Sequence, residues 1–443
     1  MMLFLLAAAC TVDGKTVLTD NDAPTWHQDV APIVVERCGG CHTSGGIGPF
    51  PLDSYLTAGP MAETAVAAVE AGTMPPFAAR ETESCTPRFD WVDDPRLSDD
   101  EKTLLRAWAD AGAPEGDPAT AAPLPNAIIP DLANIDLELQ PAEGYSTSGD
   151  EDEFMCAAMD AGTTTDTWIT GIQALPGNAL VNHHIVVFTD PNRETESWGD
   201  DYVECSGFDV TDSVPLAVWT PGSDPVALPE GAGIGFPAGA RIVIQIHFHP
   251  AGLGVADPDV STVRLRLQDE APEHEAIITS IGNFSTEDEG LLPEEDDRRQ
   301  VEFRIPPNKA NHTETMVASQ GGGDDNRFRF FSMMPHQHYI GTGMEVRWTH
   351  ANPTGEEPAE DCLVNSGWNF NWQRNYTYDA PFEELPEGRD GDSLWMQCTW
   401  DNTTDNPWVL KMLEETGETE PFAVELGETT RDEMCILIVG VLI

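Results

Sequence analysis

The stretch VNHHIVVF, residues 181 to 188, predicts a β-strand that carries two adjacent histidines. It is rich in β-branched and aromatic residues and contains neither Gly nor Pro. Neighbouring side chains on a regular strand point to opposite faces, so one of His183 and His184 should face the core and the other water. Both imidazoles can bind one ion only if the backbone leaves regular pleating there, through a β-bulge or at the strand entry.

The composition around this strand indicates a globular chain of several domains. The 443 residues correspond to roughly three domains at about 150 residues each. A hydrophobic content of 40%, with 12 Trp and 17 Phe, is enough to fill real cores. The 38 Gly and 35 Pro favour a loop-rich β architecture over helical bundles.

The charge is strongly acidic, with 77 Asp and Glu against 22 Lys and Arg and a net charge of −55. A nucleic acid partner is excluded, because phosphate binding needs clustered Lys and Arg. We interpret the excess as a solvating acidic surface, which salt adaptation would also produce. A weaker hypothesis is a protein that binds a partner through its acidic surface.

The N-terminal stretch MMLFLLAAAC resembles the end of a lipoprotein signal peptide, in which cleavage before Cys10 and lipidation tether the protein to a membrane. The apolar run is too short to span a bilayer. We expect residues 1–23 to be a leader and tether, and the protein to be exported, either periplasmic or facing the outside of the cell. The apolar tail Cys435–Ile443 has the length of a buried strand.

The residue pattern changes along the chain. A helix is predicted near residues 97–114, starting at Ser98 before acidic residues and stopping at Gly112 and Pro114. Short apolar runs separated by Gly, Pro, Asn and Asp dominate later, as in sandwich domains. The predicted domains are a helical domain over 24–117, a Pro/Ala-rich linker over 118–129, and β domains over 130–270 and 271–443, with a joint near 267–276.

The sequence CGGCH, Cys38 to His42, is the attachment signal of c-type haem. Cys38 and Cys41 would form thioethers to the vinyl groups, and His42 is placed to bind the iron. The alternative is a stray CxxC, either a disulfide or half of a zinc site, but no second CxxC follows.

Residues 24–117 also resemble a small cytochrome c domain, with DVAPIVVERCGGCH at the start and GTMPPF further on. The resemblance implies an all-α fold and makes Met74 the second axial ligand, with Met61 and His27 as alternatives. A His/Met pair raises the reduction potential, which suits an electron carrier.

The β region contains three close pairs of histidines. Alternate residues on a strand share a face, so both members of an i, i+2 pair can reach one metal. Histidines in a protein core usually occur singly, so three pairs favour metal binding. Sets of imidazoles without paired thiolates suit Cu, Zn, Fe or Ni, and a Met thioether selects Cu(I). The pairs are His183 and His184, His247 and His249, and His336 and His338.

Four motifs in order make residues 130–443 resemble the copper type II ascorbate-dependent monooxygenases, which include peptidylglycine α-hydroxylating monooxygenase and dopamine β-monooxygenase. VNHHIVVF resembles the adjacent His pair of that family, and ALPEGAGIGFPAGARIVIQIHFH its Leu-Pro-x-Gly stretch that runs into a strand ending in His247. MPHQHYIGTG resembles its His-x-His-x-x-Gly, and TTRDEMCILIV its Asp-Glu-Met-Cys.

The resemblance implies two jelly-roll-like β-sandwich domains, each with a mononuclear copper, that face each other across a solvent-filled cleft. His183, His184 and His247 would hold the electron-transfer copper. His336, His338 and Met434 would hold the catalytic copper. His249 lies one position beyond the family pattern and is left out of the ligand set, while a role as a spare ligand or as a partner of a ligand stays open. Gln245 matches a family glutamine near the electron path, although a plain strand residue is the simpler reading.

The resemblance also implies the disulfides Cys398–Cys435 and Cys156–Cys205. For Cys85 and Cys362, a bridge between the haem domain and the second β domain and two unpaired thiols stay open.

The resemblance does not extend to the residues that hold the substrate in the peptide-amidating enzyme. The peptide-amidating enzyme of the family has an Arg and a Tyr that hold a carboxylate, where this chain has Met334 and Ile438. This difference argues against peptidylglycine and for a less polar or differently held molecule.

Taken with the resemblance, the sequence predicts an exported copper monooxygenase that hydroxylates an sp³ C–H bond of a small molecule with O₂. Two coppers and one haem c per chain are expected. The fused haem would deliver electrons from a donor protein or a small reductant such as ascorbate. The alternative is a non-catalytic copper and haem electron-transfer protein on the same scaffold.

Overall fold

The computed structural model describes most of the chain from residue 23 onward. Residues 23–443 are described except 45–47, 126–130, 148–151, 180, 200, 206–209, 222, 224, 249–257, 284–289, 295, 296, 299, 322–326 and 356. The predicted leader with Cys10 and the position of His249 therefore lie outside the described residues.

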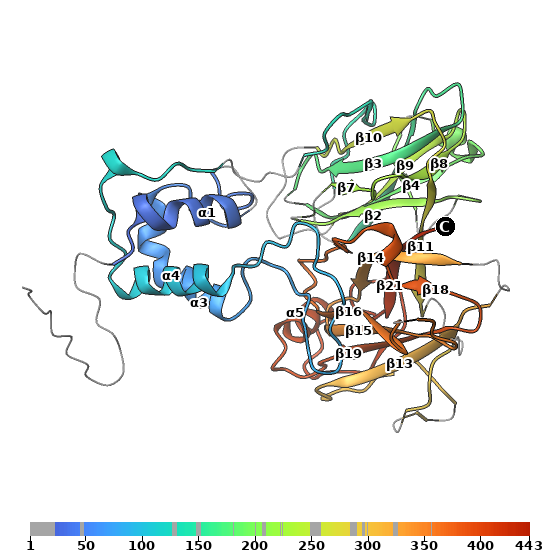
Figure 1. The fold of residues 1–443 in the computed structure, drawn as a ribbon. Coiled ribbons are helices and arrows are strands. Elements are labelled where there is room, and N and C mark those ends of the chain that lie inside the picture. The colour runs from blue at the N-terminus through green and yellow to red at the C-terminus, as the bar shows by residue number, and fades with distance from the viewer. Residues whose placement is uncertain are drawn as a thin grey trace, which may run out of the picture. The chain divides into compact units, whose positions relative to one another are not determined.

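The chain divides into two compact units. Unit 1 comprises Met1–Phe77 and Pro95–Ile129, and unit 2 comprises Ala78–Asp94 and Pro130–Ile443. The described part of unit 1 contains helices and no named strand (Figure 1). These helices are η1 (Trp26–Val30), α1 (Ala31–Arg37), α2 (Tyr55–Ala58), η2 (Gly59–Met61), α3 (Ala62–Glu70), α4 (Asp99–Asp110) and η3 (Pro118–Thr120).

Helix α4 confirms the helix predicted near residues 97–114. Ser98 is its N-cap, and its hydroxyl accepts a hydrogen bond from the backbone N–H of Glu101. The Glu101 carboxylate in turn accepts from the Ser98 backbone N–H at 2.7 Å, which completes a capping box. Gly112 follows the helix at a φ of +81°, a left-handed conformation that Gly adopts without steric cost.

The core of unit 1 is built from the apolar faces of these short helices. Trp26, Val30, Leu105 and Trp108 are buried in one cluster, and the rings of Trp26 and Trp108 lie 5.9 Å apart. Because none of the helices exceeds 12 residues, their stability depends on this packing rather than on helix propensity.

Unit 2 is mostly β-sheet, as predicted after residue 130, and its sheets are consistent with β-sandwich domains. A five-stranded sheet has the order β5 (Val203–Glu204), β2 (Glu153–Asp160), β9 (Arg241–Phe248), β4 (Asn182–Asp190), β6 (Pro215–Trp219). A four-stranded sheet has the order β13 (His312–Ser319), β19 (Ser393–Trp400), β15 (Gly341–Thr349), β16 (Glu360–Gly367).

A ten-stranded sheet contains strands from both predicted β domains of unit 2 (Figure 1). Its main path is β1 (Leu137–Leu139), β10 (Thr262–Gln268), β3 (Thr167–Leu175), β8 (Ala232–Phe236), β11 (His274–Gly282), β21 (Ile436–Leu442), β14 (Phe328–His336), β17 (Tyr376–Thr377), with β7 (Val226–Ala227) on β3 and β18 (Glu387–Gly388) on β14. The remaining elements are the pair β12 (Arg304–Ile305) and β20 (Val424–Glu425), and the helices η4 (Glu194–Trp198), η5 (Phe382–Glu384) and α5 (Pro407–Thr416).

The joint expected near residues 267–276 lies between β10 and β11, but the sheet is continuous across it. His274 and Glu275 of β11 pair in parallel with Ala232 and Gly233 of β8. Strand β11 then pairs along its length with β21, which is the buried strand predicted for the apolar tail. The two predicted β domains are therefore joined by backbone hydrogen bonds as well as by the chain.

The pattern of β9 reflects its place in the sheet. All eight of its residues are buried, since it lies between β2 and β4 and both of its faces are covered. This burial explains its nearly continuous apolar sequence, RIVIQIHF.

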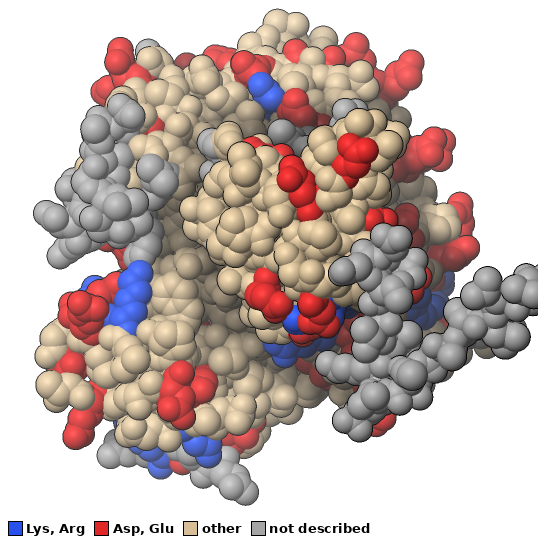
Figure 2. Space-filling model, turned by 90° about the vertical axis from the view of Figure 1, so that its left-hand side faces the viewer, with Lys and Arg blue, Asp and Glu red and all other residues tan. Residues whose placement is uncertain are grey.

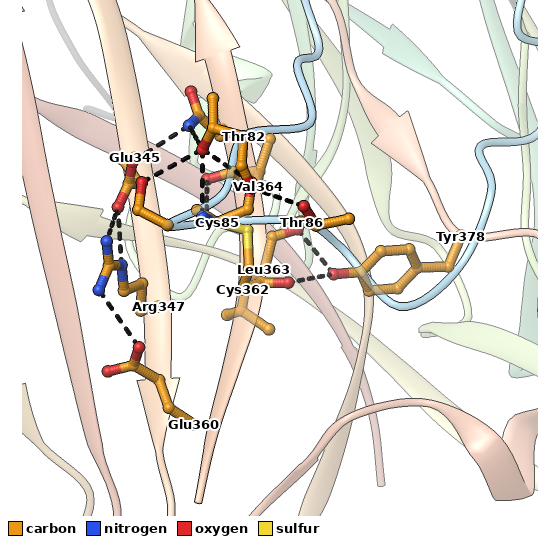
Figure 3. The surroundings of a disulfide bond; sticks show 12 residues. Thr82, Cys85, Thr86, Glu345, Arg347, Glu360, Cys362, Leu363, Val364 and Tyr378 are labelled. Carbon is orange, nitrogen blue, oxygen red and sulfur yellow. Dashed lines mark hydrogen bonds and ion pairs between the residues drawn. A yellow bond between two sulfur atoms is a disulfide. The ribbon is translucent and has the colours of Figure 1, made fainter. Parts of the chain in front are cut away.

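A segment that the sequence did not predict, Ala78–Asp94, packs in unit 2 and is called the strap below. Its Ala79 and Trp91 form β-bridges to Ser366 and Tyr378. Cys85 forms a disulfide with Cys362 of β16, and Figure 3 shows this bond among hydrogen-bonded threonines and strand residues. Within the range 24–117 expected to be one domain, the strap thus belongs to the other unit.

The described residues form three disulfides. They are Cys156–Cys205, Cys398–Cys435 and Cys85–Cys362. The first two confirm the pairings that the family resemblance implies. The third shows that Cys85 and Cys362 are paired, but within unit 2 and not as a bridge from the haem domain. Such bonds persist in oxidising compartments and indicate an exported protein. Among the described residues, no helix has the length and hydropathy needed to cross a membrane.

The acidic excess lies on the surface. On the face drawn in Figure 2, Asp and Glu side chains are spread between uncharged residues and outnumber Lys and Arg. Many of the basic residues are paired with acids, as in the contacts of Arg106 with Glu63 and of Arg264 with Glu138. This distribution fits the interpretation of a solvating acidic surface.

Candidate metal centre

Strand β4 contains the bulge that the adjacent histidines require. Asn182 pairs with Phe248 of β9, and His184 pairs with His247, so His183 is an extra residue in the ladder. A bulge of this kind turns a side chain that would otherwise point to the opposite face. The condition set by the sequence for both imidazoles to bind one ion is met.

Three imidazoles converge at this bulge. One ligand nitrogen from each of His183, His184 and His247 lies within 4.8 Å of the others. The Nδ1 atoms of His183 and His184 are 3.2 Å apart, and the ring centroids of both lie about 5 Å from that of His247. This group can hold a metal ion, as predicted.

Two aromatic residues orient this set. The His183 ring stacks on Phe370 at 4.0 Å, and its Nε2–H donates to the Phe370 carbonyl at 3.0 Å. That hydrogen bond leaves Nδ1 available as the ligand atom. The His247 ring stacks on Phe154 at 4.3 Å, with its Nε2 3.3 Å from a carboxylate oxygen of Asp152.

The second set lies where β14 ends. His336 is the last residue of β14, and the rings of His336 and His338 are perpendicular at 5.3 Å. The Nδ1–H of His336 donates to the side-chain oxygen of Gln373 at 2.9 Å, and that of His338 donates to the Asp432 carbonyl at 3.2 Å. In both residues the hydrogen bond is made by Nδ1, so Nε2 is the atom that a metal would use.

Met434 lines the same cavity as these two histidines, two residues before β21 begins. Its neighbour Cys435 is bonded to Cys398 of β19, so the segment is attached covalently to the four-stranded sheet.

Glu433 is a residue of the site that the sequence reasoning missed. It is fully buried, and its carboxyl group accepts from the backbone N–H groups of His338, Ile340 and Met434 at 2.8, 2.8 and 3.3 Å. Burial raises the pKa of this carboxyl to about 7, although the hydrogen bonds act in the opposite direction. It fixes the His338 segment to the Met434 segment, and its one sequence signal is its place in the Asp-Glu-Met-Cys motif.

The electrostatics favour neutral imidazoles. Burial lowers the pKa of His184 well below its usual value, and neighbouring imidazoles lower it further. Burial also lowers the pKa of His336, and it lowers that of His338 to about 3. A neutral imidazole is the form that binds a metal, so the donor set fits copper, which takes imidazole and thioether ligands.

Both ligand sets line one cavity of about 410 Å³. The ring of His184 in the first set lies next to that of His336 in the second set, with centroids 6.4 Å apart. The resemblance implied two sites that face each other across a solvent-filled cleft, whereas here both sets open into a common space. The pairing of β8 with β11 brings this about, since it places β14 and β21 in the same sheet as the first sandwich.

The CGGCH segment lies where α1 ends. Cys38 and Cys41 are not joined in a disulfide, and burial raises the pKa of the Cys38 thiol to about 11. The Nδ1–H of His42 donates to the Phe50 carbonyl at 2.9 Å, which leaves Nε2 free for an iron. Two cysteines that are not joined to each other, next to an oriented imidazole, are the arrangement that attachment of a c-type haem would require.

The candidates for the second axial ligand lie in different places in unit 1. Met74 follows α3 in the loop, and its N–H donates to the Ala68 carbonyl at 3.3 Å. Met61 packs against the hydrophobic core. His27 lies 3.6 Å from a carboxylate oxygen of Glu115. Met74 remains the prediction that the cytochrome c resemblance gives.

No family model and no curated protein matches the chain. Among solved structures, it is similar to the naturally occurring empty particle of cowpea mosaic virus, at 12% identity and a TM-score of 0.22, covering 68% of this chain and 92% of that one. It is also similar to the VP2 subviral particle of infectious bursal disease virus, at 8% identity and a TM-score of 0.17, covering 71% and 82%. Scores this low carry no argument about fold or function.

Proposed function

We propose that the chain is an exported copper-dependent monooxygenase that hydroxylates an sp³ C–H bond. In the overall reaction, R–H, O₂, two electrons and two protons give R–OH and water. The observation that carries the proposal is the bulge at His183, which brings three imidazoles together beside a second set with a thioether.

In this proposal the two sets have different roles. His183, His184 and His247 would hold an electron-transfer copper, and His336, His338 and Met434 a catalytic copper. The metal, when bound, supplies one-electron redox chemistry and O₂ activation. The protein keeps the imidazoles neutral by burial, orients His336 through Gln373 and surrounds both sets with a mainly apolar cavity.

Unit 1 would supply the electrons. We propose that it is a c-type cytochrome domain with haem attached at Cys38 and Cys41 and ligated by His42 and Met74. A donor protein outside the cytoplasm, or a small reductant such as ascorbate, would deliver two electrons one at a time. The expected lipid anchor at Cys10 would keep the enzyme near such donors.

The experiment is O₂ consumption by the copper-loaded full chain with ascorbate and candidate substrates, in the wild type and in Met434→Ile. We expect Met434→Ile to reduce turnover at least about a hundredfold, the scale seen when a group that tunes a metal site is lost. Met396→Ile is the matched control, because Met396 is fully buried in β19 and does not line the cavity.

Equal turnover in Met434→Ile and the wild type would contradict the proposed catalytic site. Copper and haem content without any substrate-dependent O₂ consumption would favour the non-catalytic electron-transfer protein instead.

A further inference from the structure

The floor of the cavity is arranged in cross-strand rows. His336 of β14 pairs with Ile436 of β21, and two residues further along the same strands Met334 pairs with Ile438. Because alternate residues share a face, the second row lies about 7 Å from the first on the same side of the sheet. Ser280 of β11 pairs with Ile438 on its other side, so this row reads Met, Ile, Ser.

The opposite wall repeats this arrangement. His184 of β4 pairs with His247 of β9, and the next row on that face contains Val186, which pairs with Gln245 and with Val218 of β6. All of these side chains line the cavity. The space therefore extends from the metal ligands, between both sheets, into a region whose walls are mainly aliphatic.

Charged groups are nearly absent from this space. Among the described residues that line it, Glu428 is the one Asp, Glu, Lys or Arg, and its side chain is exposed. No Lys or Arg is therefore present on the described lining to pair with a carboxylate or phosphate. Burying an unpaired charge against aliphatic side chains is costly, and a charged molecule would shift its pKa or stay in water instead.

The other polar side chains of the lining, apart from the histidines, are uncharged: the hydroxyls of Ser280, Ser332, Thr429 and Thr430 and the amides of Gln245, Gln373 and Asn375. Ser280 and Ser332 lie on the floor next to Ile438 and Gly440. A serine hydroxyl can donate to or accept from a neutral hydroxyl or carbonyl group, but it cannot neutralise a charge.

We propose that the substrate is a neutral, mainly hydrocarbon molecule whose body lies over Met334 and Ile438 and whose reacting C–H bond faces His336. This inference rests on the proposed function. In this proposal the second row of side chains on each wall selects the substrate. The substrate carries at most one uncharged polar group, which would hydrogen-bond to Ser280 or Ser332.

The test separates cavity preference from turnover. Phenethyl alcohol, phenylacetate and phenethylamine share one hydrocarbon body and differ in head-group charge. Their binding to the copper-free full chain is measured by calorimetry. We expect the alcohol to bind at least about tenfold more tightly than either ion, because only the ions lose hydration without a partner. Equal or tighter binding of either ion to the wild type would overturn the inference.

Variants of the second row sharpen the test. Met334→Arg should reverse the order, so that phenylacetate binds more tightly than the alcohol, whereas the matched variant Met334→Leu should keep the wild-type order. Ile438→Lys is the second variant, because Ile438 is less buried than Met334 and tolerates a longer side chain better. An unchanged preference in a folded Met334→Arg or Ile438→Lys would overturn the inference.

Failure of the inference and failure of the function give different results with copper and ascorbate. Hydroxylation of phenylacetate in preference to phenethyl alcohol would retain the monooxygenase and overturn the neutral substrate. Tight binding of the alcohol without O₂ consumption with any of the three probes would overturn the proposed function.

Discussion

At the scale of single residues, the site depends on one extra residue in β4 and one buried carboxyl group. The need for a bulge at His183 could be predicted, because adjacency of two histidines in a strand is visible in the sequence. The role of Glu433 could not, because its backbone donors at His338 and Ile340 are more than 90 residues away. In the sequence a buried Glu cannot be distinguished from an exposed one, because its hydrogen-bond partners are not visible there.

His350 provides a residue-scale prediction about pH. It is buried after β15, where burial lowers its pKa, but the hydrogen bond from its Nε2 to Asp361 at 2.9 Å and the charges of Glu357 and Asp392 outweigh this and raise it above the usual value. A raised pKa means that the folded state favours the protonated form. The stabilisation is complete below the unfolded pKa of about 6.5 and is lost as pH rises through the folded value.

We therefore expect the melting temperature of the wild type to exceed that of His350→Gln most at acidic pH, with the difference shrinking as pH rises. The salt bridges of Asp361 with Arg88 and of Glu357 with Arg389 belong to both proteins, so the comparison cancels their contribution. Melting is followed by calorimetry from acidic to mildly alkaline pH. A difference that grows with pH would contradict this assignment.

At the scale of elements, local signals were sufficient where an element carries its own pattern. Helix α4 has its cap at Ser98, and β21 occupies the predicted apolar tail. The strap was missed because Ala78–Asp94 has neither helical nor strand periodicity, and its position depends on Cys362, 277 residues from Cys85. The parallel pairing of β8 with β11 was missed for the same reason, since two residue pairs leave no sequence signature.

The strap gives a prediction about proteolysis. Replacing Cys85 and Cys362 by Ala removes a disulfide, which typically contributes about 2–5 kcal/mol. We expect the strap to detach locally, so that trypsin cleaves after Arg80 and Arg88 faster than in the wild type, as measured by mass spectrometry. Without the disulfide, Arg88 would still form its salt bridge to Asp361 of β16, at 2.6 Å.

The matched control for the strap removes a different disulfide. Cys156→Ala with Cys205→Ala leaves the contacts of the strap intact and should not accelerate cleavage at Arg80 or Arg88. Unchanged cleavage in the Cys85 and Cys362 variant would show that the disulfide does not hold the strap.

At the scale of the whole molecule, the chain contains a helical unit with the CGGCH sequence and a β unit with two sets of histidines. The sequence predicted the residues of both sets but not the common cavity, because the cavity depends on the continuous sheet through β11. The net charge of −55 bears on solubility and on the choice of partners rather than on the fold.

The central claim is that the two sets of side chains each bind a copper ion. The most direct measurement is the copper content per chain of the purified full-length protein, by elemental analysis, in the wild type and in His183→Ala. We predict two coppers in the wild type and one in His183→Ala, because that change removes a ligand of the first set and leaves His336, His338 and Met434 intact. A wild-type chain that retains no copper would contradict the account.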